Sequence, residues 1–405
     1  MAKKFKLVTL LGIRPDIIRM HKLIELLDEG QKKANYTHIF AHTGQHFDYE
    51  LDEVFYRQLA VRKPDVNFHV GKILKEGGGH TTHVYQTGLL FQKLASYVEE
   101  TKPDAIMYLG DTNSVISSII TARYRIPVIH IEGGGRSFDW RMPEEKDRII
   151  IDHLSDMIYC YLPRYKNILL SEGIPEFRIK VVGNIIDDAL KSFLPLSEKS
   201  AILEKLGVKK GFYALVTIHR EENTEGKEEL TKKVEGLVRL SKDLTIVFPV
   251  MPRVKRALDT FSLSVLLSRS NIIQTKPLGF LDFLHLEKYA KVIITDSGTV
   301  QEEALILGVP CLVTRLSTER PETIQAGATI LANDDLYKNV LKALTLKRNW
   351  DRTALNPFNT SPSEVIFHDI ISKMRSGFFQ KSRGFNYIKA DSFVKQAYGK
   401  FETLK

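Results

Sequence analysis

The stretch from Phe5 to Gly44, FKLVTLLGIRPDIIRMHKLIELLDEGQKKANYTHIFAHTG, contains the structural unit that the chain repeats. A short apolar run comes first, a longer segment with apolar residues at helical spacing follows, and a second apolar run closes the stretch. This order predicts a strand, a helix and a second strand parallel to the first. The same alternation continues through residues 80–134, so we expect a doubly wound parallel sheet.

A second series of such units follows the polar stretch at residues 194–207. It comprises apolar runs at 213–220, 244–250 and 291–298 and helical patterns at 228–240 and 300–308. A chain of 405 residues is long enough for two cores. We therefore predict an α/β fold of two Rossmann-like domains facing a cleft. The predicted parts are residues 1–190, residues 191–360, which would bind the nucleotide, and C-terminal helices at 361–405 that pack back on the first domain.

The composition favours a globular protein that binds a small anionic molecule. Hydrophobic residues make up 43% and charged residues 26% of the chain. The net charge is +9, but the lysines are spread along the chain without interleaved aromatic residues, so we expect no nucleic-acid binding. The apolar run near the N-terminus is too short for a signal peptide or membrane span. Cys160 and Cys311 lie in apolar stretches, which predicts buried, reduced thiols, a cytoplasmic location and no zinc site.

Polar residues at the carboxyl ends of the predicted strands mark the ligand crevice, because those ends face it in open parallel sheets. They form five segments: GIRP at 12–15, GDT at 110–112, HIEGGG at 130–135, HREEN at 219–223 and TDSG at 295–298. None contains the spaced glycines of a dinucleotide fingerprint or a P-loop lysine. We therefore expect no nicotinamide cofactor, and no metal.

Three carboxylates of the first half are candidates for catalysis. Asp111 ends an apolar run and can be a helix N-cap or a reacting group. Glu132 precedes three glycines, which allow close approach of the backbone to a ligand. Glu144 lies in the predicted first turn of a helix, where its alternative role is to stabilise the helix dipole.

The second half supplies cations and a predicted helix N-terminus. His219 ends an apolar run, although a lone histidine is more often structural. Ser297 and Gly298 lead into a helix whose N–H groups suit a phosphate, and Glu302 or Glu303 on its first turns can accept ribose hydroxyls. Arg320 is a natural cation for a diphosphate, with a surface ion pair to Glu319 or Glu322 as the alternative.

At these residues the chain resembles the UDP-N-acetylglucosamine 2-epimerase family, from about residue 7 to residue 335. The resemblance is carried, in order, by GIRPDIIRM, TGQHFDYEL, LGDTNS, HIEGGGRSFDWRMPEEKDRIIIDHLSD, VVGNIIDDAL, VTIHREEN, PLGFLDFL, TDSGTVQEEALILGVP and TERPETIQAG. It implies the glycosyltransferase B-type fold, a homodimer, a UDP-sugar substrate and no cofactor. By position, the acidic catalytic residues of the family correspond to Asp111, Glu132 and Glu144, and its histidine corresponds to His219. Its diphosphate and uridine contacts correspond to Arg14, Ser297, Gly298, Glu303 and Arg320; Arg19 replaces a lysine, and we add Arg136 as a substrate ligand.

The reaction that the resemblance implies is the conversion of UDP-N-acetylglucosamine to UDP-N-acetylmannosamine, or the same C2 inversion on a related UDP-2-acetamido sugar, for cell-surface polysaccharide precursors. Glu132-Gly-Gly-Gly-Arg136 differs from the Glu-Ala-Gly-Leu-Arg of the family, and Thr299 replaces a glycine. TGQHFDYELDEVF and DSGT are similar to the branch that acts on diacetamido-glucuronate or 6-deoxy-aminosugar nucleotides. A UDP-2,3-diacetamido-glucuronate 2-epimerase, a hydrolysing 2-epimerase, a glycosyltransferase and a non-catalytic UDP-sugar sensor stay open as alternatives.

Overall fold

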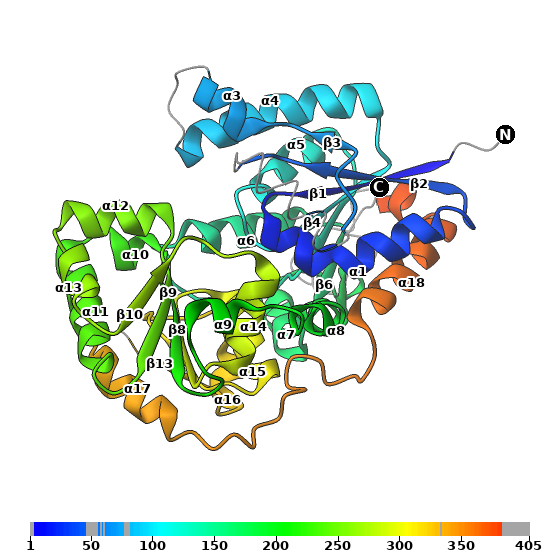
Figure 1. Ribbon diagram of the computed structural model, residues 1–405. Coiled ribbons are helices and arrows are strands. Elements are labelled where there is room, and N and C mark those ends of the chain that lie inside the picture. Colours follow the sequence, from blue (N-terminus) through cyan, green and yellow to red (C-terminus); the bar gives the residue numbers. More distant parts are fainter. Residues whose placement is uncertain are drawn as a thin grey trace, which may run out of the picture.

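Two parallel sheets surrounded by helices form two domains that lie side by side (Figure 1). The computed structural model describes residues 4–45, 56, 59, 61–76, 82–332 and 334–382. The strand orders are β3-β2-β1-β4-β5-β6-β7 in the first sheet and β10-β9-β8-β11-β12-β13 in the second. The predicted fold class is confirmed. Most of the motif TGQHFDYEL, and the C-terminal residues from Arg383 onward, lie outside the described residues.

The first domain contains the first sheet and the helices around it. Its strands are β1 (Phe5–Leu11), β2 (Tyr36–His42), β3 (Val66–Asn67), β4 (Ala105–Leu109), β5 (Val128–Ile131), β6 (Met157–Cys160) and β7 (Ile179–Val181). Its helices are α1 (Arg14–Gly30), α3 (Val70–Glu76), α4 (His83–Thr101), η1 (Val115–Ser117), α5 (Ser118–Arg123), α6 (Pro143–Leu154), α7 (Pro163–Ser171), η2 (Glu176–Arg178) and α8 (Ile186–Ser197).

The second domain contains the second sheet. Its strands are β8 (Tyr213–Thr217), β9 (Thr245–Pro249), β10 (Ile272–Thr275), β11 (Val292–Thr295), β12 (Cys311–Val313) and β13 (Thr329–Leu331). Its helices are α9 (Ile202–Leu206), α10 (Glu221–Thr224), α11 (Lys227–Leu240), α12 (Pro252–Thr260), α13 (Ser264–Ser268), α14 (Phe280–Tyr289), α15 (Gly298–Leu307), α16 (Pro321–Gln325) and α17 (Leu336–Leu344). The helices α18 (Pro362–Arg375) and α19 (Phe378–Ser382) follow.

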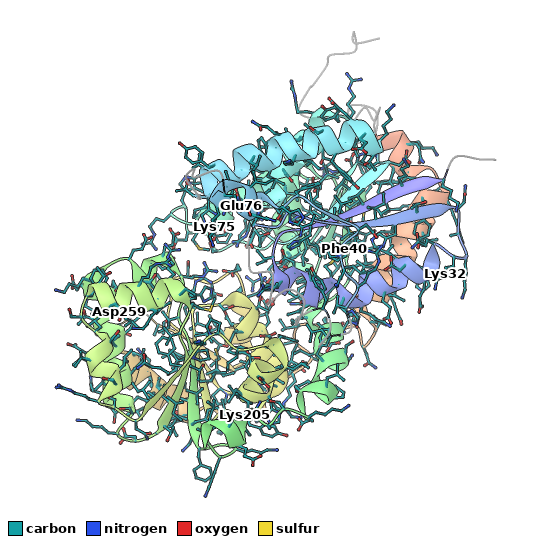
Figure 2. All side chains as sticks on the ribbon, turned by 45° about the horizontal axis from the view of Figure 1, so that its top comes forward. Lys32, Phe40, Lys75, Glu76, Lys205 and Asp259 are labelled. Carbon is teal, nitrogen blue, oxygen red and sulfur yellow. The ribbon has the colours of Figure 1, made fainter. Side chains whose placement is uncertain are left out.

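The central strands are buried on both faces, which explains why they are continuous apolar runs without alternation. Six of the seven residues of β1 are buried, and this strand pairs in parallel with β2 and β4. Phe40 of β2 lies inside the first domain, whereas Lys205 and Asp259 lie at the edge of the second (Figure 2). Both cysteines are buried free thiols.

Helix α18 returns to the first domain and packs against α1 (Figure 1). Ser361 caps its N-terminus, and the Asp188 carboxylate of α8 accepts hydrogen bonds from the Ser361 hydroxyl at 3.0 Å and the Ser363 N–H at 2.8 Å. Asp369 of α18 accepts a hydrogen bond from Tyr159 of β6 at 2.8 Å. The predicted boundary at residue 190 falls within α8, which packs against α1 on one side and α14 on the other.

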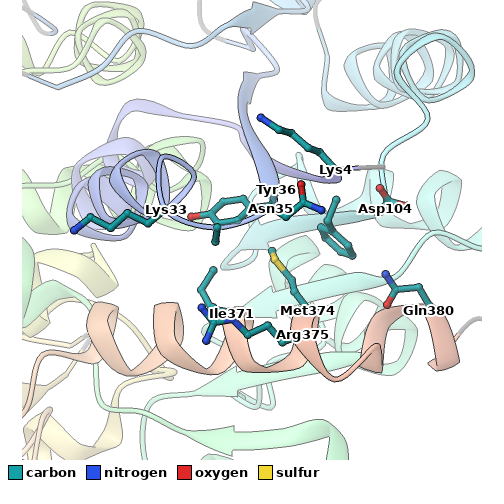
Figure 3. Close-up of a pocket in the computed structure, with 11 residues that line it drawn as sticks. Lys4, Lys33, Asn35, Tyr36, Asp104, Ile371, Met374, Arg375 and Gln380 are labelled. Atoms are coloured by element: carbon teal, nitrogen blue, oxygen red, sulfur yellow. The ribbon is translucent and has the colours of Figure 1, made fainter. Parts of the chain in front are cut away.

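A cavity of about 690 Å³ lies at the amino ends of β1 and β2, where α18 crosses them (Figure 3). Phe5 and Tyr36 line it from the sheet, and Ile371, Met374 and Arg375 line it from α18. This end of the sheet is opposite to the carboxyl ends of the strands. The carboxyl ends carry the polar segments singled out from the sequence.

Candidate active site

The carboxyl ends of β1, β4, β5, β8 and β11 lead to loops that enclose a small cavity of about 130 Å³ between the domains. Its lining includes seven residues that the sequence singled out: Arg19, Asp111, Glu132, His219, Ser297, Gly298 and Arg320. Asp16, Arg220 and Glu319 line it as well. The strand ends of both sheets therefore contribute to one site.

Glu132 occupies a strained position directly after β5. Its φ of +77° is in the left-handed region, which costs a residue with a side chain about 1–3 kcal/mol. Arg19 of α1 donates to one carboxylate oxygen at 2.6 Å, and Arg320 of the second domain pairs with the other. The Tyr161 hydroxyl lies 3.3 Å from this carboxylate. Such strain combined with two cations is typical of a functional carboxylate.

Arg320 connects the two domains. Its guanidinium pairs with Glu132 from the first domain and with Glu302 of α15. Glu302 also accepts a hydrogen bond from Asn184 at 2.8 Å, and burial raises its pKa to about 8. The alternative in which Arg320 pairs on the surface with Glu319 or Glu322 is wrong, because the side chain is buried and faces the cleft residues.

Asp111 pairs with Arg148 of α6, whose guanidinium also binds Glu145. Burial raises the pKa of Asp111, but the charge and hydrogen bond of Arg148, together with the charge of Arg320, outweigh burial and leave the pKa below its ordinary value. Asp111 is therefore an anion at neutral pH. Its alternative role as a helix cap has no support here, since the Ser114 that precedes η1 is the N-cap residue.

Glu144 is half-buried in the first turn of α6, and its charge acts on Arg220 across the cleft. One turn later Asp147 faces both Glu144 and Asp111. Burial, followed by the charges of Asp111 and Glu144, raises the pKa of Asp147 to about 7. The first turns of α6 therefore carry an ionisable group that changes charge near neutral pH.

His219 is held by Asp296, the residue that follows β11. Its Nδ1 lies 3.0 Å from the carboxylate, and the main-chain N–H groups of His219 and Arg220 donate to Asp296 at 2.9 and 3.0 Å. Burial raises the pKa of Asp296, but His219 and these donors outweigh it and keep the pKa below the ordinary value. With Nδ1 held, Nε2 is the nitrogen that can reach a ligand in the cavity.

The N-terminus of α15 lies at the cavity. Ser297 caps it by accepting a hydrogen bond from the Val300 N–H at 3.4 Å. A Cβ on Gly298 would lie 2.5 Å from a Glu319 oxygen, so glycine is required for this close approach. The carboxylate of Glu319 accepts from Arg315 at 2.9 Å and lies 3.7 Å from Arg220. Helix N–H groups beside arginines form a site suited to phosphate.

A sequence profile of the UDP-N-acetylglucosamine 2-epimerase family matches residues 28–372. The UDP-N-acetylglucosamine 2-epimerase of Methanocaldococcus jannaschii is 39% identical over 369 residues, which cover 88% of this chain and 96% of the relative. This chain belongs to the UDP-N-acetylglucosamine 2-epimerase family. It is an epimerase, and the fold is that of its family.

A crystal structure of the Methanocaldococcus jannaschii epimerase in complex with UDP-GlcNAc and UDP is similar to this structure, with a TM-score of 0.81 and 38% identity over 91% of this chain and 99% of that one. A second branch of the family is also related. The UDP-2,3-diacetamido-2,3-dideoxy-D-glucuronate 2-epimerase of Pseudomonas aeruginosa is 33% identical over 328 residues, which cover 80% of this chain and 88% of the relative.

Arg136 is placed away from the cavity lining of this epimerase. Its buried guanidinium binds Asp152 at 2.8 Å and Glu172 at 2.6 Å. Asp152 in turn accepts from the Gly134 N–H at 3.1 Å and lies 2.8 Å from His130. The arginine thus fixes the glycine run after Glu132. Arg14, at the first position of α1, Glu144, in the first turn of α6, and Glu303, buried in α15, are also not among the residues that line the cavity.

Sequence reasoning did not assign a role to several residues that act in this site. Asp16 accepts hydrogen bonds from the Ile13 N–H at 3.3 Å and the Thr112 hydroxyl at 3.4 Å, and burial raises its pKa to about 7. Arg148, Asp147, Asp296, Arg220 and Glu319 are the others. Asp296 and Arg220 had a signal, their places at strand ends. Asp16, Asp147 and Arg148 lie inside helices, where polar residues are ordinary.

Among the described residues, no group of three or more His, Cys, Asp and Glu side chains is arranged to hold a metal ion. No helix in the described part of the chain is long and apolar enough to cross a membrane.

Proposed function

We propose that this epimerase inverts C2 of UDP-N-acetylglucosamine by elimination and re-addition of UDP. The observation that carries the proposal is the position of Glu132, held between Arg19 and Arg320 in the cavity that also contains Asp111, His219 and the N-terminus of α15. One cavity thus combines carboxylates for proton transfer with cations for a leaving diphosphate.

Elimination avoids a carbanion that no adjacent carbonyl would stabilise. A base takes the C2 proton while the C1–O bond to UDP breaks, and the electron pair of the C–H bond forms the C1–C2 double bond of a glycal. An acid then returns a proton to the opposite face of C2, and UDP adds back at C1. The net reaction is neutral in protons and electrons, so it consumes no nicotinamide.

The residue roles follow from where the charges lie. We assign Asp111, Glu132 and Glu144 to proton transfer and to stabilising positive charge on the sugar ring, without dividing them between faces. A diphosphate bound at Ser297 and Gly298 would attract Arg320, which withdraws that cation from Glu132 and leaves the carboxylate able to accept a proton. His219 would bind the diphosphate or transfer a proton. Arg14 and Glu303 are expected at the nucleotide, with Arg136 acting through the glycine run.

The experiment is incubation with UDP-N-acetylglucosamine in deuterium oxide, followed by proton NMR. Deuterium at C2 with recovery of both epimers supports the proposal. UDP-2,3-diacetamido-glucuronate is run in parallel, because one relative is named for that sugar. Release of free sugar and UDP would indicate a hydrolysing enzyme, and no turnover without an acceptor would contradict an epimerase. The homodimer and the cytoplasmic location remain proposals, to be checked by sedimentation and by cell fractionation.

A further inference from the structure

Tyr165 of α7 links the first domain to the loop that carries Arg320. Its hydroxyl lies 2.7 and 2.8 Å from the two carboxylate oxygens of Glu322 and 3.1 Å from the carbonyl oxygen of Glu319. A hydroxyl has one hydrogen, so at these distances Tyr165 donates to the Glu322 carboxylate. Both side chains are buried. The contact therefore crosses from α7 of the first domain to α16 of the second (Figure 1).

The position of Tyr165 is fixed by the glycine run that follows Glu132. A Cβ on Gly134 would lie 2.6 Å from the Tyr165 carbonyl oxygen, and Gly134 has a φ of +83°. The first turn of α7 thus packs directly against the loop after β5, an approach that requires glycine. Tyr165 contacts the loop of Glu132 with its main chain and the loop of Arg320 with its side chain.

The carboxylate of Glu322 competes with the active site for Arg320. The two residues are two positions apart at the start of α16, and burial raises the pKa of Glu322, while the charge of Arg320 and the hydrogen bond from Tyr165 oppose the rise. Arg320 nevertheless pairs with Glu132 and Glu302, and within the described ranges no ion pair joins it to Glu322. The hydroxyl of Tyr165 satisfies Glu322 in place of Arg320.

The main chain of the Arg320 loop is held without this contact. Gln301 of α15 donates to the Arg320 carbonyl at 3.1 Å and accepts a hydrogen bond from the Thr318 hydroxyl at 2.8 Å. These bonds lie within the second domain, so they hold the loop whether or not Tyr165 donates. The phenol therefore acts on the charge of Glu322 rather than on the folding of the loop.

Loss of the Tyr165 hydroxyl would leave Glu322 buried without its donor, which is unfavourable for a carboxylate. Arg320 exerts the strongest attraction on Glu322, so it is the cation best placed to replace that donor. Turning toward Glu322 would take its guanidinium away from Glu132 and the cavity. Arg164, the other cation that acts on Glu322, already donates to Gln325 at 3.2 Å.

We propose that Tyr165 is a positioning residue for Arg320: its hydroxyl binds Glu322 and so keeps the guanidinium aimed at Glu132 and at the diphosphate of the substrate. The inference rests on the proposed function, in which Arg320 binds the leaving diphosphate. It also explains why the pairing of Arg320 with Glu322 that the sequence allows is not formed.

The test compares Tyr165→Phe, Glu322→Gln and the double variant by calorimetric titration with UDP and with uridine. Y165F keeps the ring but leaves Glu322 able to capture Arg320, so it binds UDP roughly tenfold more weakly while its affinity for uridine stays parental. E322Q still accepts a hydrogen bond from Tyr165 and attracts no cation, so it keeps the parental affinity for UDP. In the double variant no anion at position 322 competes for Arg320, so the parental affinity for UDP returns.

Tyr159→Phe is the matched control, because it removes an equivalent hydrogen bond from a buried phenol, to the Asp369 carboxylate at 2.8 Å, outside the cavity lining. It lowers the melting temperature without changing the affinity for UDP. If Y165F binds UDP as tightly as the parent, Tyr165 does not position Arg320.

The double variant decides the question even where Y165F fails to fold, because it leaves no buried charge at position 322. A double variant that fails to fold, or that binds UDP more weakly than the parent, shows that the hydroxyl is needed for packing and not for aiming Arg320. A parent chain that binds no UDP contradicts the proposed function instead.

Discussion

The two sides of the cleft differ in their balance of charge although they are built from similar strand-and-helix units. The first domain lines the cavity with three carboxyl groups, Asp16, Asp111 and Glu132, and one cation, Arg19. The second lines it with His219, Arg220, Arg320 and the N-terminus of α15, and with one carboxylate, Glu319. The difference indicates a division of labour in which the first domain handles protons on the sugar and the second holds the nucleotide. The first domain also places its key acid on a strained backbone, whereas the second uses an ordinary capped helix.

The largest effect is expected from removing a charge on the carboxylate side. Glu132→Gln keeps the size of the side chain but cannot accept a proton, so turnover should fall by roughly 10² or more. The affinity of this variant for UDP should change only a few-fold if the second domain, and not the first, holds the nucleotide. Asp111→Asn and Glu144→Gln should behave alike, and Glu364→Gln on the exposed face of α18 is the control. A Glu132→Gln enzyme that folds, binds UDP and epimerises at a near-parental rate would show Glu132 to be structural.

A smaller effect is expected from Asp296→Asn, which tests whether His219 depends on its partner. The amide offers one acceptor in place of two, where His219 and two main-chain N–H groups now donate. Turnover should fall roughly tenfold to a hundredfold because the imidazole loses its fixed orientation. Steady-state kinetics and circular dichroism measure this. Unchanged kcat with an unchanged pH profile would exclude His219 from the reaction.

Arg320→Lys should weaken UDP binding roughly tenfold, since lysine keeps the charge but not the planar fork that spans Glu132 and Glu302. Turnover at saturating substrate should fall less than in Glu132→Gln. Isothermal titration with UDP and with uridine separates the diphosphate contribution. If the Arg320→Lys variant loses as much affinity for uridine as for UDP, Arg320 does not bind the diphosphate.

The smallest effect concerns stability and pH. The pKa of Asp147 is about 7 in the folded chain against an ordinary value of 3.8, so between these values the folded state binds more protons than the unfolded state. Asp147 therefore destabilises the fold progressively as the pH rises from about 4 to about 7, and by a constant amount above that pH. Asp147→Asn should melt like the parent near pH 4 and a few degrees higher near pH 8. If the melting temperatures of Asp147→Asn and the parent differ by the same amount at every pH in this range, the raised pKa of Asp147 is contradicted.

The sequence predicted the architecture because buried parallel strands leave a direct trace, continuous apolar runs followed by polar strand ends. Asp111, Glu132 and His219 were found for that reason. Arg136 was predicted to bind substrate, but its position depends on Glu172, which is 36 residues away and gives no local signal. The raised pKa of Asp147 depends on burial between α6 and the loop after β4, a tertiary property. Spacing along the chain cannot supply such information.

The return of α18 to the first domain bears on how the cleft can move. The chain passes from the first domain to the second after α8 and passes back between α17 and α18 (Figure 1). A domain attached by a single chain segment can rotate in any direction about that segment. A domain attached by two segments can rotate only about the line that joins them. The domains should therefore open by a hinge rotation about the axis through these two connecting segments. Each closing movement would bring Glu132 of the first domain to the nucleotide site of the second in the same alignment, so the geometry of the site would be repeated in every catalytic cycle.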